Sequence, residues 1–106
     1  MGNCTVLDVR DRITTGLEDP QISRIIDRAD EEIALFNGYD SASVSQKNSA
    51  SSKVAAAIIH ERGEGTYGEN SSIRQMMELA QHLRDSAMRD LKRVTNRWNS
   101  VDPLED

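Results

Sequence analysis

The chain has 106 residues, of which only 37% are hydrophobic, with one Phe, one Trp and two Tyr. A single domain of this size buries a modest core, so we expect its stability to depend on oligomerisation or on a host assembly. The net charge of −5 disfavours binding to nucleic-acid phosphates, the lone Cys4 fits a reducing compartment, and the absence of long apolar runs predicts a soluble, non-secreted protein.

A short helix is predicted near the N-terminus. Thr5 and Asp8 have the spacing of a capping box, in which each side chain accepts a hydrogen bond from the other residue's backbone N–H. The apolar positions Val9 and Ile13 follow on one helical face, and we expect the helix to end near Gly16.

A second helix is predicted to begin with Asp19 as the N-cap and Pro20 as the first helical residue. We expect Asn37-Gly38 to close it, since both residues tolerate a left-handed turn. Its apolar residues fall on one face at helical spacing, and they are Ile22, Ile25, Ile26, Ala29, Ile33 and Phe36.

The segment 40–52 is rich in serine and contains one large apolar residue, Val44. Such a segment buries too little surface to offset its ordering entropy, so it is predicted to be a mobile loop or a piece that orders against a neighbour. Helix resumes over 53–62, which is short and rich in alanine and is expected to be central in the fold.

A long helix is predicted over 71–98, with Asn70 or Ser71 as its N-cap. Arg84 takes one position of its apolar stripe, and we expect it to pair with an acidic group of a neighbouring helix or chain, because an unpaired buried guanidinium is costly. The stripe is widened by a second apolar row, so the helix requires cover from more than one side. The two rows are Ile73, Met77, Ala80, Ala87, Leu91, Val94 and Trp98, and Met76, Leu79, Leu83 and Met88.

Two patterns could carry chemistry. Gly63, Gly65 and Gly68 match a nucleotide-binding glycine spacing, but a helix and not a strand precedes them, which favours a flexible turn. Glu78, His82 and Asp85 share one face of the long helix and could approach a metal ion, although no matching motif occurs on another helix. We expect a solvated face there, no metal, no cofactor, no catalytic residue and no enzyme.

The sequence therefore predicts a small all-α bundle of about four helices, formed by residues 1–98, with a long C-terminal helix. Residues 99–106 are predicted to form an extended acidic tail that docks on a partner. Trp98 continues the apolar stripe and is expected in the core, whereas Tyr67 could be a core residue or an interface anchor. The candidate partner-binding residues are Tyr67, Trp98, Val101 and Leu104.

This helix order resembles that of the head-to-tail connector (adaptor, or head-completion) proteins of tailed bacteriophages. The likeness covers roughly residues 5 to 98 and includes the segments 25–39 and 65–70. It implies a non-enzymatic virion protein, located in the phage neck and in the host cytoplasm during assembly. It further implies a ring, commonly of twelve copies, that joins the portal protein to the next neck or tail protein, with DNA passing through without specific binding and no membrane contact.

A second interpretation is a small cytosolic helical regulator, such as an antitoxin-like or anti-repressor protein, whose long helix docks onto one partner. The number of copies that associate in solution distinguishes the two classes of protein. A connector should be monomeric or weakly associated when free and ringed on a portal, whereas a coiled-coil regulator should be a stable dimer at micromolar concentration. A four-helix metal or cofactor bundle enzyme ranks below both.

Overall fold

The computed structural model of the chain describes residues 3–65 and 72–101, with side chains in the last helix described as far as Leu91. These residues form four helices and no named strand: α1 (Val6–Arg10), α2 (Asp19–Ile33), α3 (Val44–Glu61) and α4 (Ile73–Val101). An isolated backbone bridge joins Thr15 to Gly65. The predicted small all-α bundle with a long last helix is confirmed.

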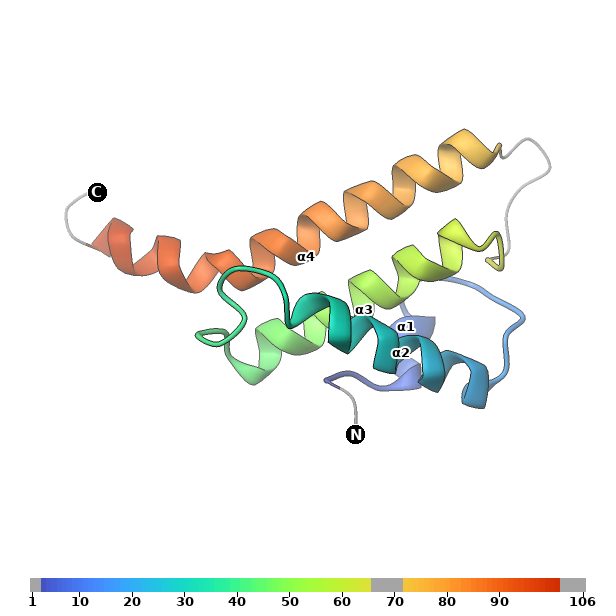
Figure 1. Ribbon diagram of the computed structural model, residues 1–106, viewed down its shortest axis with the longest axis horizontal. Helices are drawn as coiled ribbons and strands as arrows, with labels where there is room; N and C mark the ends of the chain where they lie inside the picture. Colours follow the sequence, from blue (N-terminus) through green and yellow to red (C-terminus); the bar gives the residue numbers. More distant parts are fainter. Residues whose placement is uncertain (1–2, 66–71, 102–106) are drawn as a thin grey trace.

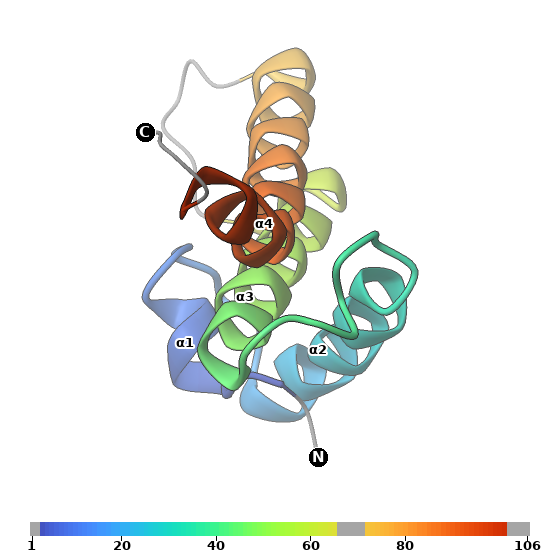
Figure 2. The ribbon, with the colours of Figure 1, turned by 90° about the vertical axis from the view of Figure 1, so that its left-hand side faces the viewer.

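Helix α3 lies in the middle of the molecule. Helix α4 packs along one side of it, and α1 and α2 pack on the other side (Figures 1 and 2). Its consecutive residues Val54 to Ile59 are all buried, as expected for a helix with neighbours on several sides. This burial confirms the prediction that the alanine-rich helix is central. Its small side chains let the other helices approach closely.

The first two helices have the predicted apolar spacing but end earlier than predicted: α2 ends at Ile33, with Ala34 as its C-cap, and is not closed by Asn37-Gly38. The Asp8 carboxylate of α1 accepts a hydrogen bond from the Thr5 N–H at 2.8 Å, which completes the predicted capping box, but α1 ends at Arg10, well before Gly16. Helix α2 starts one residue earlier than predicted: Glu18 is the N-cap, and its N–H donates to Gln21 Oε1 at 2.8 Å. Five of the six apolar residues predicted for its inner face are buried and Phe36 is half-buried against them, as expected.

Helix α3 is the largest difference from the sequence prediction, because 44–52 is helical and not a loop. Ser43 is its N-cap, and Ser43 and Gln46 form a capping box through hydrogen bonds of 2.9 and 3.2 Å. At the other end, Gly63 has a φ of 70° and the Glu64 N–H donates to the Ile59 carbonyl at 3.0 Å. This is a Schellman ending, in which glycine adopts the left-handed conformation at low cost.

Helix α4 also differs from prediction at both ends. Its N-cap is Ser72, whose hydroxyl accepts from the Gln75 N–H, and not Asn70 or Ser71, which lie outside the described residues. At the other end the helix continues to Val101, so the first three residues of the predicted extended tail 99–106 are helical. The rest of that tail lies outside the described residues.

Candidate interaction surface

Among the described side chains of α4, as far as Leu91, those from the middle of the apolar stripe onward are covered by α3, and those at its start are not. Ala80, Ala87 and Leu91 are fully buried, and Leu83 packs against the same core. Two polar contact sets, one on each side of this line, fix the position of α4 on the rest of the molecule. The middle of α4 is therefore held firmly against α3, and this packing fixes the position of the exposed residues on the same helix.

The first set is centred on Arg84. Its Nε lies 2.5 Å and its Nη2 lies 3.1 Å from the two carboxylate oxygens of Glu32 on α2, and Nη1 contacts Glu61 on α3. The hydrogen bonds to Glu32 raise the pKa of Arg84 further above its ordinary value. The predicted pairing of Arg84 with an acidic group of a neighbouring helix is confirmed, and it ties α4 to α2 and α3 at once.

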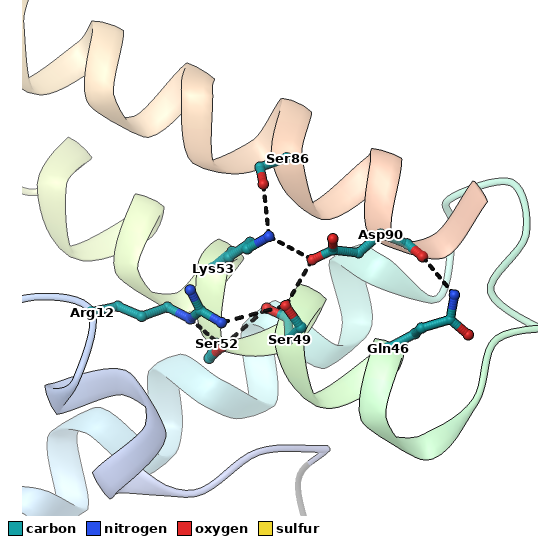
Figure 3. Close-up of polar contacts among 7 residues, drawn as sticks. All are labelled: Arg12, Gln46, Ser49, Ser52, Lys53, Ser86 and Asp90. Carbon is teal, nitrogen blue, oxygen red and sulfur yellow. Dashed lines mark hydrogen bonds and ion pairs between the residues drawn. The ribbon is translucent and has the colours of Figure 1, made fainter. Parts of the chain in front are cut away.

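The second set joins α4 to the serine-rich start of α3 (Figure 3). Lys53 Nζ lies 2.6 Å from the Asp90 carboxylate and 2.7 Å from the Ser86 hydroxyl, and Ser49 donates to the same carboxylate at 2.7 Å. Both charged side chains are at least 85% buried. Because each is paired and hydrogen-bonded, a charge that would otherwise be costly to bury is accommodated between the two helices.

The opposite side of α3 is held in a similar way. Arg12 Nε donates to the Ser52 hydroxyl at 2.6 Å, and the Ser51 hydroxyl donates to Asp30 of α2 at 2.6 Å. Cys4 Sγ lies 3.4 Å from the same Ser51 hydroxyl. Burial raises the pKa of the Cys4 thiol to about 11, so it stays protonated at neutral pH and has little reactivity as a nucleophile.

The N-terminal half of α4 leaves apolar side chains uncovered. Ile73 is 74% exposed and Met77 is 49% exposed, and Leu79 and Met88 are also exposed further along the helix. A hollow of about 270 Å³ lies between these first turns and the C-terminal turn of α3. It is lined by His60, Glu61, Arg62, Gly63, Ile73, Met76 and Met77. An exposed methionine-rich helix face beside a hollow is typical of a surface that packs against another helix.

The C-terminal part of α4 runs past the N-terminal end of α3. Gln46, in the first turn of α3, donates to the Asp90 carbonyl at 3.0 Å, so the start of α3 lies beside Asp90. Since α4 continues to Val101, its last ten residues extend about 15 Å further, and Figure 1 shows this end projecting from the molecule. We call residues 92–101 the C-terminal arm.

The patterns considered for chemistry do not converge on a catalytic or metal centre in the part of the chain that the structure describes. Gly63 ends α3, and Gly65 is in the bridge to Thr15, while Gly68 lies outside the described residues. His82 is exposed on α4, and no group of three or more His, Cys, Asp or Glu side chains within 3–65 and 72–91 is placed to hold a metal ion. A hollow of about 520 Å³ along α2 is lined by charges of both signs.

The predicted partner-binding residues lie at the edge of what the structure describes. Tyr67 and Leu104 are outside the described residues. Trp98 and Val101 are in helical backbone on the C-terminal arm, and their side chains are outside the description, so the expected core position of Trp98 stays a prediction. The exposed start of α4 was not singled out from the sequence, although Ile73 and Met77 head the apolar stripe.

Comparisons with protein-family profiles, with curated proteins and with solved structures found no match to this chain. Within the described residues, no helix combines the length and the apolar composition needed to cross a bilayer.

Proposed function

We propose that the chain is a structural subunit of the tailed-phage neck, where copies of it form a ring that joins the portal to the tail. One observation carries the assembly part of this proposal: α4 is longer than the surface that covers it. At one end its exposed Ile73 and Met77 present apolar surface that a neighbouring subunit would bury, and at the other end its backbone continues as helix to Val101, past the start of α3.

The physical reason is the modest core of the chain. Burying apolar surface stabilises a protein by about 25 cal/mol per Å², so covering Ile73 and Met77 adds a few kcal/mol that the isolated domain lacks. A ring requires two different contact surfaces on each subunit, because a head-to-tail interface repeats around the axis. The separate ends of α4 suit such an arrangement, and the net charge of −5 suits a channel through which DNA slides.

The identity of the assembly is tested by adding the chain to purified portal rings and examining the mixture by electron microscopy. We expect extra density, with the rotational symmetry of a ring, on the tail-facing side of the portal. A chain that does not bind portal rings, and is instead a stable dimer at micromolar concentration, would contradict the proposal and favour the helical regulator.

A pair of matched variants tests the role of the α4 surface in this assembly. Replacing Ile73 and Met77 with Asp should prevent ring formation while leaving the fold intact, because both side chains are exposed in the single chain. Leu7→Asp is the control, since Leu7 is equally exposed but lies on α1. If both variants form rings on the portal, the start of α4 is not an interface.

A further inference from the structure

The outer face of α2 carries charges of both signs that are not paired within the chain. Arg24, Asp27, Arg28 and Glu31 are all exposed, and none of them forms an ion pair among the described residues. All four line the hollow of about 520 Å³, so the structure places them on one surface. Figure 2 shows α2 on the outside of the molecule, with α3 on its inner side. This face is therefore open to a second molecule.

The order of the four charges is symmetric. Arg24, Asp27, Arg28 and Glu31 alternate in sign along one stripe of the helix, and reversing the direction of the helix exchanges the signs. Two copies of α2 that lie antiparallel, with a two-fold axis between positions 27 and 28, bring Arg24 level with Glu31 of the second copy. The same axis brings Asp27 level with Arg28. Each charge then meets its opposite, whereas a parallel pair in register would place like charges together.

The charged stretch has an apolar residue at each end. Leu35 follows Glu31 by four residues and is 85% exposed, and its N–H donates to the Glu32 carbonyl at 3.1 Å, so the turn of helix continues to it. Pro20 precedes Arg24 by four residues and is also exposed. The antiparallel pairing that matches the charges also brings Leu35 of one copy level with Pro20 of the other. An apolar contact at each end of the ion pairs adds to their attraction.

The face has no net charge, although the chain as a whole has a net charge of −5. Arg62 and Glu64, which line the same hollow, are again one base and one acid. A second copy that approaches this face therefore meets less like-charge repulsion than at an average site on the surface.

We infer that α2 of one copy pairs antiparallel with α2 of a second copy across a two-fold axis. Such a contact closes after two copies, because both copies use the same surface. It is separate from the proposed ring contact, which uses the start of α4. Exposed ion pairs each contribute little, so the dissociation constant is expected to be about 0.1 to 1 mM, far weaker than the micromolar dimer of a helical regulator.

Charge reversal tests the two-fold pairing by sedimentation equilibrium of the full chain up to about 1 mM, in about 50 mM salt, where exposed charges are only partly screened. Arg24→Glu should raise the dissociation constant about tenfold, because two attractive contacts become repulsive. Glu31→Arg should do the same, even though it reduces the net charge. An equimolar mixture of the two variants should return to within about threefold of the original value, because each introduced charge meets its opposite on the other variant.

The controls are Arg89→Glu and Glu78→Arg, which make the same charge changes at exposed positions on α4. Each should leave the dissociation constant within about twofold of the original, and mixing them should add nothing. The inference is overturned if the original chain stays monomeric throughout, or if the mixture of α2 variants associates no more than either variant alone. It is also overturned if Ile73→Asp abolishes association, since the copies would then meet through the start of α4, a result that leaves the proposed function standing.

Discussion

Helices α3 and α4 show two ways in which a weakly apolar chain can build a core. Helix α3 is poor in large side chains, yet from Ala50 to Ile59 it is buried nearly all round because its serines and alanines fit between three neighbours. Helix α4 has the clearer apolar stripe, yet part of that stripe is exposed. Apolar residues on α3 thus contribute to the fold, whereas those at the start of α4 remain available for association.

The same substitution at two isoleucines tests this difference most directly. Ile59→Ala on α3 should lower the free energy of unfolding by about 4 kcal/mol, because it leaves a cavity at a fully buried position. Ile73→Ala on α4 should change it by less than about 0.5 kcal/mol, as is usual at exposed positions. Urea denaturation of the dilute chain measures both, and equal losses would mean that the two helices are covered alike.

The ion pair between α3 and α4 is expected to have the next largest effect. Lys53→Met leaves the Asp90 carboxylate buried without its cation and should cost about 3 kcal/mol in the same assay. The double variant Lys53→Met/Asp90→Leu should recover most of that loss, because it removes both charges. A double variant as unstable as the single one would show that the pair contributes through packing or through the serine hydroxyls and not through charge.

A smaller effect is expected at the glycine that ends α3. Gly63→Ala should cost about 1 kcal/mol, since alanine is strained at a φ of 70° even though a Cβ would meet no atom within 4 Å. Gly16→Ala is the control, because that site is equally open and its φ is not positive. Equal melting temperatures for the two variants would argue against the Schellman ending.

The smallest expected effect is the change in stability with pH that His60, at the end of α3, contributes. Burial lowers the pKa of His60, so the unfolded chain, in which His has its ordinary pKa near 6.5, takes up a proton more readily than the folded chain. The contribution of His60 is present above pH 6.5 and is lost as the pH falls towards its lowered folded pKa. We expect the melting temperature to fall between pH 7.5 and 5.5, and to fall less in His60→Gln. The pKa of Asp8 is lowered from 3.8 by the Thr5 N–H, so its effect appears at lower pH.

Much of the fold could be predicted because its signals are local. The apolar spacing of α2 and the Thr5–Asp8 capping box depend on residues a few positions apart, and the position of Arg84 in an apolar stripe was enough to predict an acidic partner. The partners Glu32 and Glu61 themselves could not be named, since which helices pack together depends on the whole fold.

The first half of α3 shows why the rest could not be predicted. Its serines suggested a loop because they bury little apolar surface, but they are ordered by Arg12, Asp30 and Asp90, which lie 21 to 41 residues away. One local signal was present and unused: Ser43 and Gln46 have capping-box spacing.

The burial of α3 also has a consequence for how the chain opens. Its amide protons are enclosed by α4 on one side and by α1 and α2 on the other, so they can exchange with solvent only when the helices separate. The amides of the arm, beyond the last contact with α3, require only fraying of a helix end. Hydrogen exchange should therefore divide α4 into a slow middle and a fast arm.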